Sequence, residues 1–305
     1  MPELPEVQTT VDGLNRTVKG RIIKDVWTDY KSMHRMHADS IKDPAFFARF
    51  KKQVKGKKIV RAARRAKNIL IELSGGLTIL IHMEMTGHMM YGKYEYKKKE
   101  NKWIAAEKGP LADPFNQFIH FVLALDKGFL AFSDMRKFAK VTLIKTSELD
   151  RTPHLANLGP EPLSKSFTYI LFRERLAKRP NMKVKQALMD QSLISGIGNI
   201  YSDEILWRAN VHPLSIVSKI PEANLKLMYK AILETLKKGI DFGGDSTSDY
   251  RNIKGERGAF QAAHSAYQRT GKPCVKRGCP GIIKRIVVGQ RSAHFCPVHQ
   301  KLFKN

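Results

Sequence analysis

The hydrophobic pattern changes its period near residue 150, and this change sets the domain organisation of the chain. From about residue 20 to 145, short apolar runs follow one another without intervening helices, as in 118–134, where two β-rich runs flank the turn-forming DKG. Successive strands of this kind indicate a β-sandwich or barrel-like domain. Four segments with helical period follow between residues 166 and 242. The sequence therefore predicts an α+β chain in which an N-terminal β-sandwich domain precedes a helical domain.

The change of pattern also gives the domain boundaries that we predict. Residues 1–150 form the β-sandwich domain, preceded by a short helix, residues 151–270 form the helical domain, and residues 271–305 form a small terminal module. The stretch 93–110 is rich in lysine and is predicted to be a solvated surface loop. The stretch 243–261 is rich in glycine and polar residues, lacks periodicity, and is predicted to be a mobile loop.

The charge of the chain points to a polyanionic partner. Lysine and arginine number 54 against 28 aspartates and glutamates, which gives a formal charge of +26 and a pI near 10.0. We find no apolar run of about 18 residues and no signal-peptide pattern, so we expect no association with a membrane and no secretion. Nucleic acid is the favoured partner. Charge alone does not indicate an enzyme, because ribosomal proteins and structural RNA binders are equally basic.

The three cysteines lie in the last 35 residues and are spaced like metal ligands. The candidate ligands follow the pattern C-x4-C, then sixteen residues, then C-x2-H, and they are Cys274, Cys279, Cys296 and His299. Two tight pairs separated by a β-rich run suit a tetrahedral metal, so we predict one closed structural zinc site. The alternative is three buried cysteines and a surface histidine. An odd cysteine count argues against disulfides and for a reduced, cytoplasmic compartment.

Two further stretches are suggestive without being specific. IIKRIVV and RSAHF read as strands joined at GQ, and Arg291 beside that turn is free to reach a phosphate. In SGIGNIYSDEILWRA, Gly196 and Gly198 precede a helix that begins near Asn199, which can cap the helix and offer its amide to a phosphate. The same glycines are equally typical of an ordinary turn before a helix that binds no ligand. MPELPEV, taken alone, is typical of a weakly capped terminus.

Taken together, these stretches resemble the bacterial formamidopyrimidine-DNA glycosylase family of DNA base-excision repair enzymes. The resemblance rests on MPELPEV, SGIGNIYSDEILWRA and the C-terminal four-ligand finger, and it extends in order through RRAKNILIEL, IHMEMTG, SDMRKFA, LGPEPLS and RTGKPC. It implies a helix-two-turn-helix in the helical domain and a terminal β-hairpin zinc finger. The implied activity is that of a bifunctional DNA glycosylase and abasic-site lyase that excises oxidised purines, 8-oxoguanine and formamidopyrimidine.

The resemblance also implies the catalytic residues. Once Met1 is removed, Pro2 presents a secondary amine that attacks C1′ of the damaged nucleoside and forms a Schiff base, after which β- and δ-elimination cut the strand. Glu3 corresponds to the general acid and base. Glu6 matches a glutamate of less defined role, and stabilising a helix N-terminus is an equally good interpretation. Lys67 matches a lysine of the catalytic and phosphate-binding set.

The same transfer gives the DNA-binding residues. The phosphate contacts are Lys67, His82, Asn199 and Arg291, and the residues inserted into the gap left by the flipped base are Met85, Arg136 and Phe138. Lys185 aligns with a lysine near the lesion, and 243–261 corresponds to the loop that covers the extruded base. Without the resemblance, Lys67 reads as a lysine of a basic face, His82 as a core histidine, and Met85 and Phe138 as core residues.

The chain departs from the family pattern in its finger and in its length. Family fingers carry four cysteines with two residues between paired ligands, whereas here the first pair encloses four and the last ligand is His299. The regions before Lys67 and near residue 93 are longer than usual. The partner that we expect is double-stranded DNA containing oxidised bases or abasic sites, bound by a monomer in the cytoplasm and associated with the nucleoid.

Three other functions compete with this prediction. An endonuclease VIII-like glycosylase for oxidised pyrimidines would share the fold, and a non-catalytic zinc-containing DNA-binding relative would share the phosphate contacts and the finger. A ribosome-associated zinc ribbon protein would explain the charge and the finger but not the order of the other motifs. Pro2 and Glu3 argue for an enzyme, because a pure binder has no physical need for proline at this position.

Overall fold

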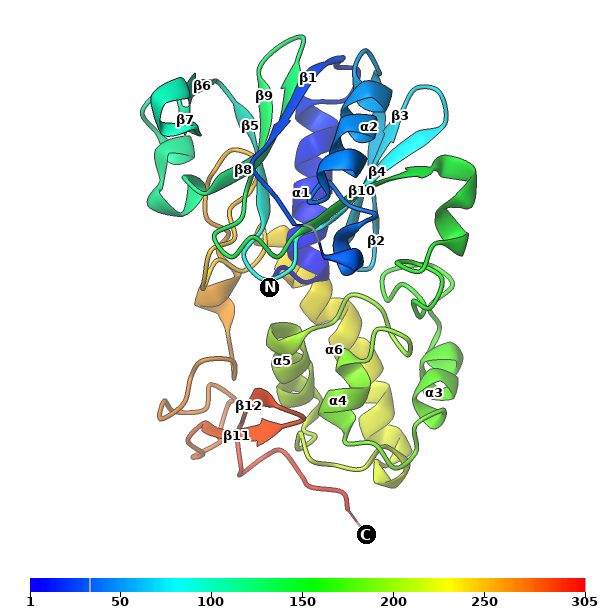
Figure 1. The fold of residues 1–305 in the computed structure, drawn as a ribbon. Coiled ribbons are helices and arrows are strands. Elements are labelled where there is room, and N and C mark those ends of the chain that lie inside the picture. The colour runs from blue at the N-terminus through cyan, green and yellow to red at the C-terminus, as the bar shows by residue number, and fades with distance from the viewer. Residues whose placement is uncertain (33, 305) are drawn as a thin grey trace. The chain divides into compact units, whose positions relative to one another are not determined.

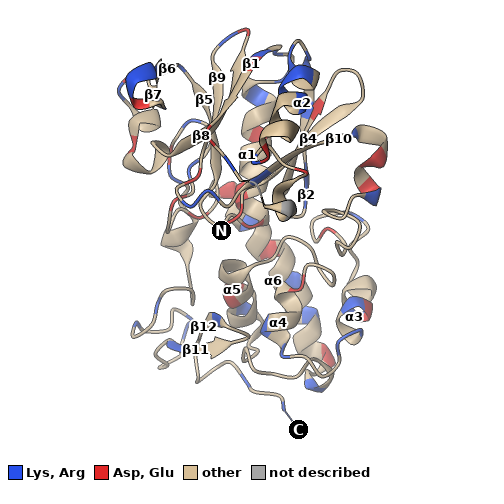
Figure 2. Ribbon diagram, viewed as in Figure 1, with Lys and Arg blue, Asp and Glu red and all other residues tan. Residues whose placement is uncertain are grey.

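A computed structural model describes residues 1–32 and 34–304, which divide into two compact units (Figure 1). The first unit comprises Met1–Ala156 and Phe242–Ala259, and the second comprises Asn157–Asp241 and the residues from Phe260 onward. Lysine and arginine are distributed over both units (Figure 2). In the described part of the chain, no helix combines the length and the apolar character needed to cross a membrane.

Two four-stranded antiparallel sheets form the first unit, which confirms the predicted β-sandwich. One sheet has the order β1 (Ile23–Thr28), β8 (Ile119–Leu125), β9 (Phe129–Ser133) and β5 (His88–Gly92). The other has the order β10 (Lys140–Lys145), β4 (Leu77–His82), β3 (Asn68–Leu73) and β2 (Ile59–Arg65). The predicted DKG turn joins β8 to β9, with Gly128 at φ +72° in the left-handed region that glycine adopts without strain.

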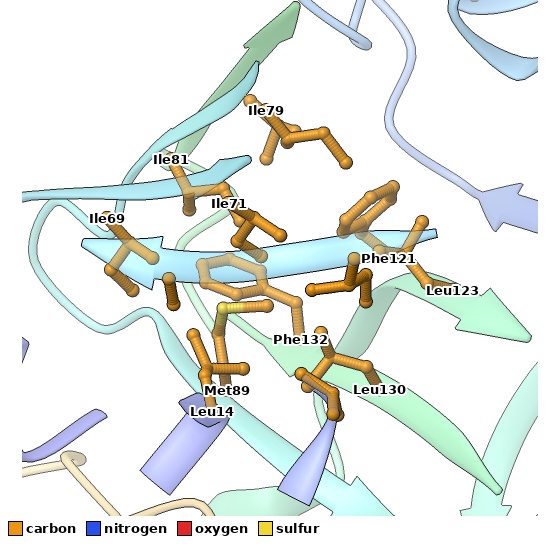
Figure 3. Close-up of a cluster of buried hydrophobic side chains, with 14 of the residues drawn as sticks. Leu14, Ile69, Ile71, Ile79, Ile81, Met89, Phe121, Leu123, Leu130 and Phe132 are labelled. Atoms are coloured by element: carbon orange, nitrogen blue, oxygen red, sulfur yellow. The ribbon is translucent and has the colours of Figure 1, made fainter. Parts of the chain in front are cut away.

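Alternating apolar residues of both sheets build the core between them. Side chains of β3 and β4 face those of β8 and β9 in Figure 3, and the labelled residues of these strands are Ile69, Ile71, Ile79, Ile81, Phe121, Leu123, Leu130 and Phe132. Because side chains alternate across a strand, the inner face of each sheet is apolar along its whole length. Other apolar groups must pack on this face to keep it from water. Helix α1 (Leu4–Thr17) adds Val7, Val11 and Leu14 to the same cluster.

The first unit contains a second helix that the sequence analysis did not predict. Helix α2 (Pro44–Val54) begins after Asp43, whose carboxylate accepts a hydrogen bond from Phe46 N at 2.7 Å. Phe50 and Val54 are buried in the core. An aspartate at the N-cap followed by proline at the first helical position is a helix-start signal that could have found it.

The prediction of a surface loop at 93–110 is wrong. Strands β6 (Tyr94–Lys97) and β7 (Lys102–Ala105) form a hairpin there. Aromatic packing accounts for it, because the Trp103 ring lies 5.4 Å from Tyr96 and 5.1 Å from Phe129 between centroids. The hairpin is also rich in lysine. This composition led the sequence analysis to predict a solvated loop and to overlook the aromatic residues.

The second unit contains the predicted helices and the terminal hairpin. The helices are α3 (Tyr169–Ala177), α4 (Val184–Met189), α5 (Asn199–Ala209) and α6 (Glu222–Asp241), and the hairpin strands are β11 (Lys284–Val288) and β12 (Arg291–Phe295). The hairpin turns at Gly289 and Gln290, which both have positive φ, at 55° and 61°. Two successive positive φ values match the twist of flanking antiparallel strands. Short 3-10 turns occur at 35–37, 98–100, 110–112, 114–116, 146–151, 217–219 and 260–263.

Residues 242–259, which we call the return segment, depart from the predicted domain boundaries. This fully described segment has no helix or strand, as expected, but it packs within the first unit and not with the helical domain of 151–270. Tyr250 and Ile253 are buried. A Cβ built on Gly13 of α1 would lie 2.6 Å from Ile253 Cγ2, so a glycine is needed at this contact. The return segment is therefore a packed part of the sandwich, and not the mobile loop that we predicted.

Candidate active site and nucleic-acid interface

The start of the chain is buried and capped, so the interpretation of MPELPEV as a weakly capped terminus is wrong. Glu3 is the N-cap of α1, and its backbone N–H donates to Glu6 Oε2 at 2.7 Å. In return the Glu3 carboxylate accepts from the Glu6 backbone N–H, which completes a capping box. Pro5 stands in the first turn, where a missing N–H costs nothing. Pro2 and both glutamates are buried.

Burial shifts the terminal amine, which here belongs to Met1, toward its neutral form. Desolvation lowers the pKa of the Met1 amino group, and the charge of Lys67 lowers it further, whereas Glu3, Glu6 and Asp249 act in the opposite direction. Lys67 is nearly buried in the turn between β2 and β3. An amine that loses its proton more readily offers its lone pair at neutral pH. The structure thus brings three predicted catalytic residues around the amino terminus.

Glu6 has a defined structural role at this site. It is 1% exposed, and its two carboxylate oxygens accept from the backbone N–H groups of Glu3 and Asp245, the latter at 2.7 Å. The Tyr250 hydroxyl donates to the Glu6 carbonyl at 3.0 Å. Glu6 therefore stabilises the start of α1, as one of our two interpretations held, and it also fixes the return segment against that helix.

His82 ends β4 and is half-buried, so it is not a core histidine. The Glu84 backbone N and carboxylate lie 3.1 and 3.2 Å from His82 Nδ1, and burial lowers the pKa of the imidazole. We assign the neutral ring, in which the Glu84 N–H donates to Nδ1 and the proton is on Nε2. In this tautomer Nε2–H is a hydrogen-bond donor, which is what a phosphate contact requires.

The three predicted gap-filling residues lie on two adjoining loops of the first unit. Met85 is half-buried in the turn between β4 and β5, whereas Arg136 and Phe138 are exposed in the loop between β9 and β10. Phe138 is 50% exposed, which excludes the core interpretation, and its ring centroid lies 4.4 Å from the Arg136 guanidinium. An apolar ring stacked with a cation on an exposed loop suits insertion beside a base.

Asp134 holds these two loops together, and the sequence analysis missed it. Its carboxylate is fully buried and accepts from Thr86 Oγ1 at 2.6 Å, Tyr30 OH at 2.9 Å and Ala139 N at 2.9 Å. Thr86 Oγ1 in turn accepts from Arg136 N at 3.1 Å. One buried carboxylate thereby orients the turn that carries Met85 and the loop that carries Arg136. The sequence signal that could have identified Asp134 is an acidic residue at the end of an apolar strand.

The second unit presents Asn199 as predicted but not as a cap. Gly198 is the N-cap of α5, and Asn199 is the first helical residue. Asn199 Oδ1 is buried and accepts no hydrogen bond from any described residue. Its amide is thus not engaged in capping, while the N-terminal N–H groups of α5 still favour an anion.

The prediction that Lys185 binds DNA is wrong for this structure. Lys185 is 0% exposed, and its Nζ lies 2.5 Å from Asp203 Oδ1 and 3.1 Å from Ser202 Oγ. A fully buried ammonium must be paired, and here the pair lies wholly within the second unit. Lys185 is a structural residue that supports α5.

Asp203 extends this ion pair to the finger. Its second oxygen accepts from His294 N at 2.9 Å and contacts His294 Nδ1 at 2.9 Å. His294 is on β12, which begins at the exposed Arg291. The buried network of Lys185, Asp203 and His294 therefore fixes the helix that begins at Asn199 and the hairpin that carries Arg291 in one arrangement.

The four predicted metal ligands come together in the second unit. One ligand atom from each of Cys274, Cys279, Cys296 and His299 lies within 4.8 Å of all the others. His299 Nε2 lies 3.2 Å from the Trp207 carbonyl, and this hydrogen bond fixes the tautomer so that Nδ1 points to the sulfurs. Three thiols and an imidazole in this arrangement can hold a metal ion.

Family models match both halves of the chain. The formamidopyrimidine-DNA glycosylase N-terminal domain matches residues 1–141, and the formamidopyrimidine-DNA glycosylase H2TH domain matches 158–251. The chain belongs to the formamidopyrimidine-DNA glycosylase family. The H2TH match also confirms the predicted helix-two-turn-helix.

Curated relatives and solved structures of the family extend over the whole length. Formamidopyrimidine-DNA glycosylase of Cereibacter sphaeroides is 35% identical over 302 residues, 99% of this chain and 100% of the relative. That of Herpetosiphon aurantiacus is 36% identical over 301 residues, 98% and 100%. The structure of Lactococcus lactis Fpg in complex with DNA containing an abasic site superposes with a TM-score of 0.82 at 30% identity, covering 98% and 99% of the two chains.

Replacing Asp134 by asparagine tests its role in this glycosylase fold. Asp134→Asn keeps the shape but replaces one of the two accepting oxygens with an NH2 group that faces buried donors, so we expect the free energy of unfolding to fall by about 1–3 kcal/mol. Amide hydrogen exchange in 134–139 should accelerate. The exposed Asp150→Asn is the control, and equal exchange in the two variants would show that Asp134 does not organise the loops.

The buried ion pair is tested by single and double replacement. Asp203→Asn leaves the Lys185 ammonium buried without a carboxylate, and we expect a loss of about 3–5 kcal/mol in urea unfolding. Lys185→Met combined with Asp203→Asn should recover part of this loss and should bind DNA better than Asp203→Asn alone. If Lys185 contacted DNA directly, the double variant would instead bind more weakly.

Proposed function

We propose that this chain is a bifunctional DNA glycosylase and abasic-site lyase that excises oxidised purines and acts as a monomer. The observation that carries the proposal is the start of the chain, where Pro2 is buried and the charges of the buried Glu3, Glu6 and Lys67 act on the terminal amine, in a chain of this family. The capping of α1 accounts for Glu3 and Glu6, but a passive DNA-binding protein has no need of a proline at the second position. A proline at that position suits an amine nucleophile.

The mechanism uses Pro2 as the nucleophile after removal of Met1. The secondary amine forms a bond to C1′ as the glycosidic bond breaks and the base departs with the bonding electrons. Because the proline nitrogen keeps no proton in the resulting imine, the adduct is a cationic iminium that withdraws electrons from the sugar. Glu3 protonates the ring oxygen as the sugar opens and then moves the protons of β- and δ-elimination.

Each unit offers groups for the DNA backbone. In the first unit, Lys67 and the Nε2–H of His82 contact phosphates. In the second unit, Asn199 and Arg291 do so. We propose that Met85, Arg136 and Phe138 fill the gap left by the flipped base, with Asp134 fixing their loops. Solved relatives support DNA as the partner, since a Lactococcus lactis Fpg mutant has been solved with Fapy-dG-containing DNA and Lactococcus lactis Fpg with abasic-site DNA.

We propose that the terminal cluster would hold one structural zinc ion. Three cysteines and one histidine supply the four ligands that a closed zinc site requires, and they would leave no open position for catalysis. The His299–Trp207 hydrogen bond connects the site to α5. Because Cys296 directly follows β12, a bound metal would also stabilise the hairpin that carries Arg291. A DNA substrate places the protein where the chromosome lies, which we propose is the bacterial cytoplasm and its nucleoid.

Borohydride trapping tests the nucleophile. The protein is incubated with a duplex carrying one 8-oxoguanine opposite cytosine, reduced, and the cross-linked residue is identified by mass spectrometry. We expect an adduct on Pro2, impaired excision with persisting DNA binding for Pro2→Gly, and unchanged trapping for Pro5→Ala.

Two results of this experiment would overturn the proposal. Unchanged excision by Pro2→Gly would exclude the amine as the nucleophile. An adduct that forms only with an oxidised pyrimidine would move the chain to the endonuclease VIII-like branch.

Metal analysis tests the finger. We expect about one zinc per chain in the purified protein and a loss of zinc in Cys296→Ser, with weaker DNA binding. His212→Gln is the control, because His212 lies against Phe295 beside the finger without being a ligand. Full zinc content in Cys296→Ser would contradict the assigned ligand set.

A further inference from the structure

We propose that Asp113 and Asn116 are positioning residues that hold the return segment over the amino terminus, and that they are needed for excision of a base but not for cleavage at an abasic site. This inference rests on the proposed function. The two residues lie in the 3-10 turns that follow the β6–β7 hairpin, in a region for which the sequence analysis gave no function.

One end of the return segment is fixed beside the amino terminus. Glu6 Oε1 accepts from Asp245 N at 2.7 Å, and the Tyr250 hydroxyl donates to the Glu6 carbonyl. The charge of Asp249 acts on the terminal amine. The residues between these anchors, 247–249, are polar and at least partly exposed. They are the part of the segment that can meet a base held at the amine.

Arg251 fixes the segment beyond this exposed part. Its side chain is 3% exposed, and its Nη2 lies 3.3 and 3.4 Å from the two carboxylate oxygens of Asp113. Its Nη1 donates to the carbonyls of Ser248 and Tyr250, and the guanidinium carbon lies 4.8 Å from the Phe115 ring centroid. The charged contact to Asp113 and the ring contact together restrict the position of the guanidinium. Asp113 thereby sets where the segment leaves the amino terminus.

Asn116 makes a second and fully buried attachment. Its Nδ2 donates to the carbonyls of Gly255 and Pro110 at 3.1 and 2.8 Å, and its Oδ1 lies 2.8 Å from His88 Nε2. Two carbonyls can only accept, so they fix the amide orientation, and Oδ1 accepts from the imidazole. Burial lowers the pKa of His88, which is consistent with a neutral ring that donates through Nε2.

The backbone at Gly255 packs so closely on Asn116 and Pro110 that no side chain can be accommodated there. Gly255 has φ +82°, and a Cβ there would lie 2.9 Å from Asn116 Nδ2 and from the Pro110 carbonyl. The return segment is thus held before 247–249 by the contact of Asp245 with Glu6, and after it by the contact of Tyr250 with Glu6 and by those of Arg251 and Gly255 with Asp113 and Asn116. A segment ordered in advance loses less conformational entropy when a ligand contacts it.

The two substrates of the proposed enzyme make different demands on this segment. An extruded base has a surface that residues 247–249 can contact, whereas an abasic site has no base. Loosening the attachment should therefore reduce excision and leave elimination at a preformed abasic site intact. A general loss of folding would reduce both activities.

The test compares Asp113→Asn with Glu107→Gln in the full-length protein. The amide introduced by Asp113→Asn can still cap the 3-10 turn through the Phe115 N–H but lacks the charge that holds Arg251, whereas Glu107 pairs with Lys93 on the exposed surface of the same region. Single-turnover rates are measured on a duplex with 8-oxoguanine and on the same duplex with an abasic site. We expect about a 10-fold loss of excision in Asp113→Asn, with abasic-site cleavage within about 2-fold of the unmodified protein. Glu107→Gln should match the unmodified protein on both substrates.

Arg251→Met is the second variant, because it keeps the packing on Phe115 and removes the charge from the other side of the pair. It should reproduce the selective loss, and hydrogen exchange in 245–256 should accelerate in both variants. Equal losses on the two substrates, or none on either, would overturn the inference. Absence of both activities in the unmodified protein would instead overturn the proposed function itself.

Discussion

The hydrogen bonds that the buried carboxylate of Glu6 accepts are the interactions on which the arrangement of the site depends. One oxygen accepts from the backbone of Glu3 and so fixes the start of α1, and the other accepts from Asp245 and so fixes a segment that is more than 200 residues away in the sequence. A buried carboxylate without such donors would cost several kcal/mol. The helix start and the return segment therefore form together, and the amino terminus is desolvated as a result.

Buried acids play the same organising role elsewhere in the molecule. Asp134 gathers two loops of the first unit, and Asp203 joins α5 to the finger. Glu204 accepts from the backbone N–H groups of Ser265, Ala266 and Tyr267, each at 2.8 Å, and so fixes the chain that leads to the finger. In a chain with a formal charge of +26, the few buried acids position backbone and leave most basic side chains for a polyanion.

Lys185 shows where transfer by resemblance fails. The family pattern places a lysine near the lesion, and in this chain the matching lysine lies beside Asp203, which provides a buried counter-charge. The ion pair removes the ammonium from the surface. A role that depends on exposure cannot be carried over by alignment alone, because exposure is decided by neighbours from other elements.

The sequence by itself determined the α+β organisation, most strands and helices, the cluster of three cysteines and one histidine, and the motifs by which the chain resembles its family. These follow from local periodicity, ligand spacing and contiguous motifs, which a single stretch of chain contains. Only the tertiary structure decided that 242–259 belongs to the sandwich, that Glu6 holds it, that Asp134 and Asp203 organise functional loops, and that Lys185 is buried. Each of these depends on hydrogen bonds between residues from 5 to 244 positions apart in the sequence. No local pattern specifies such partners, because burial and pairing arise only when the elements pack together.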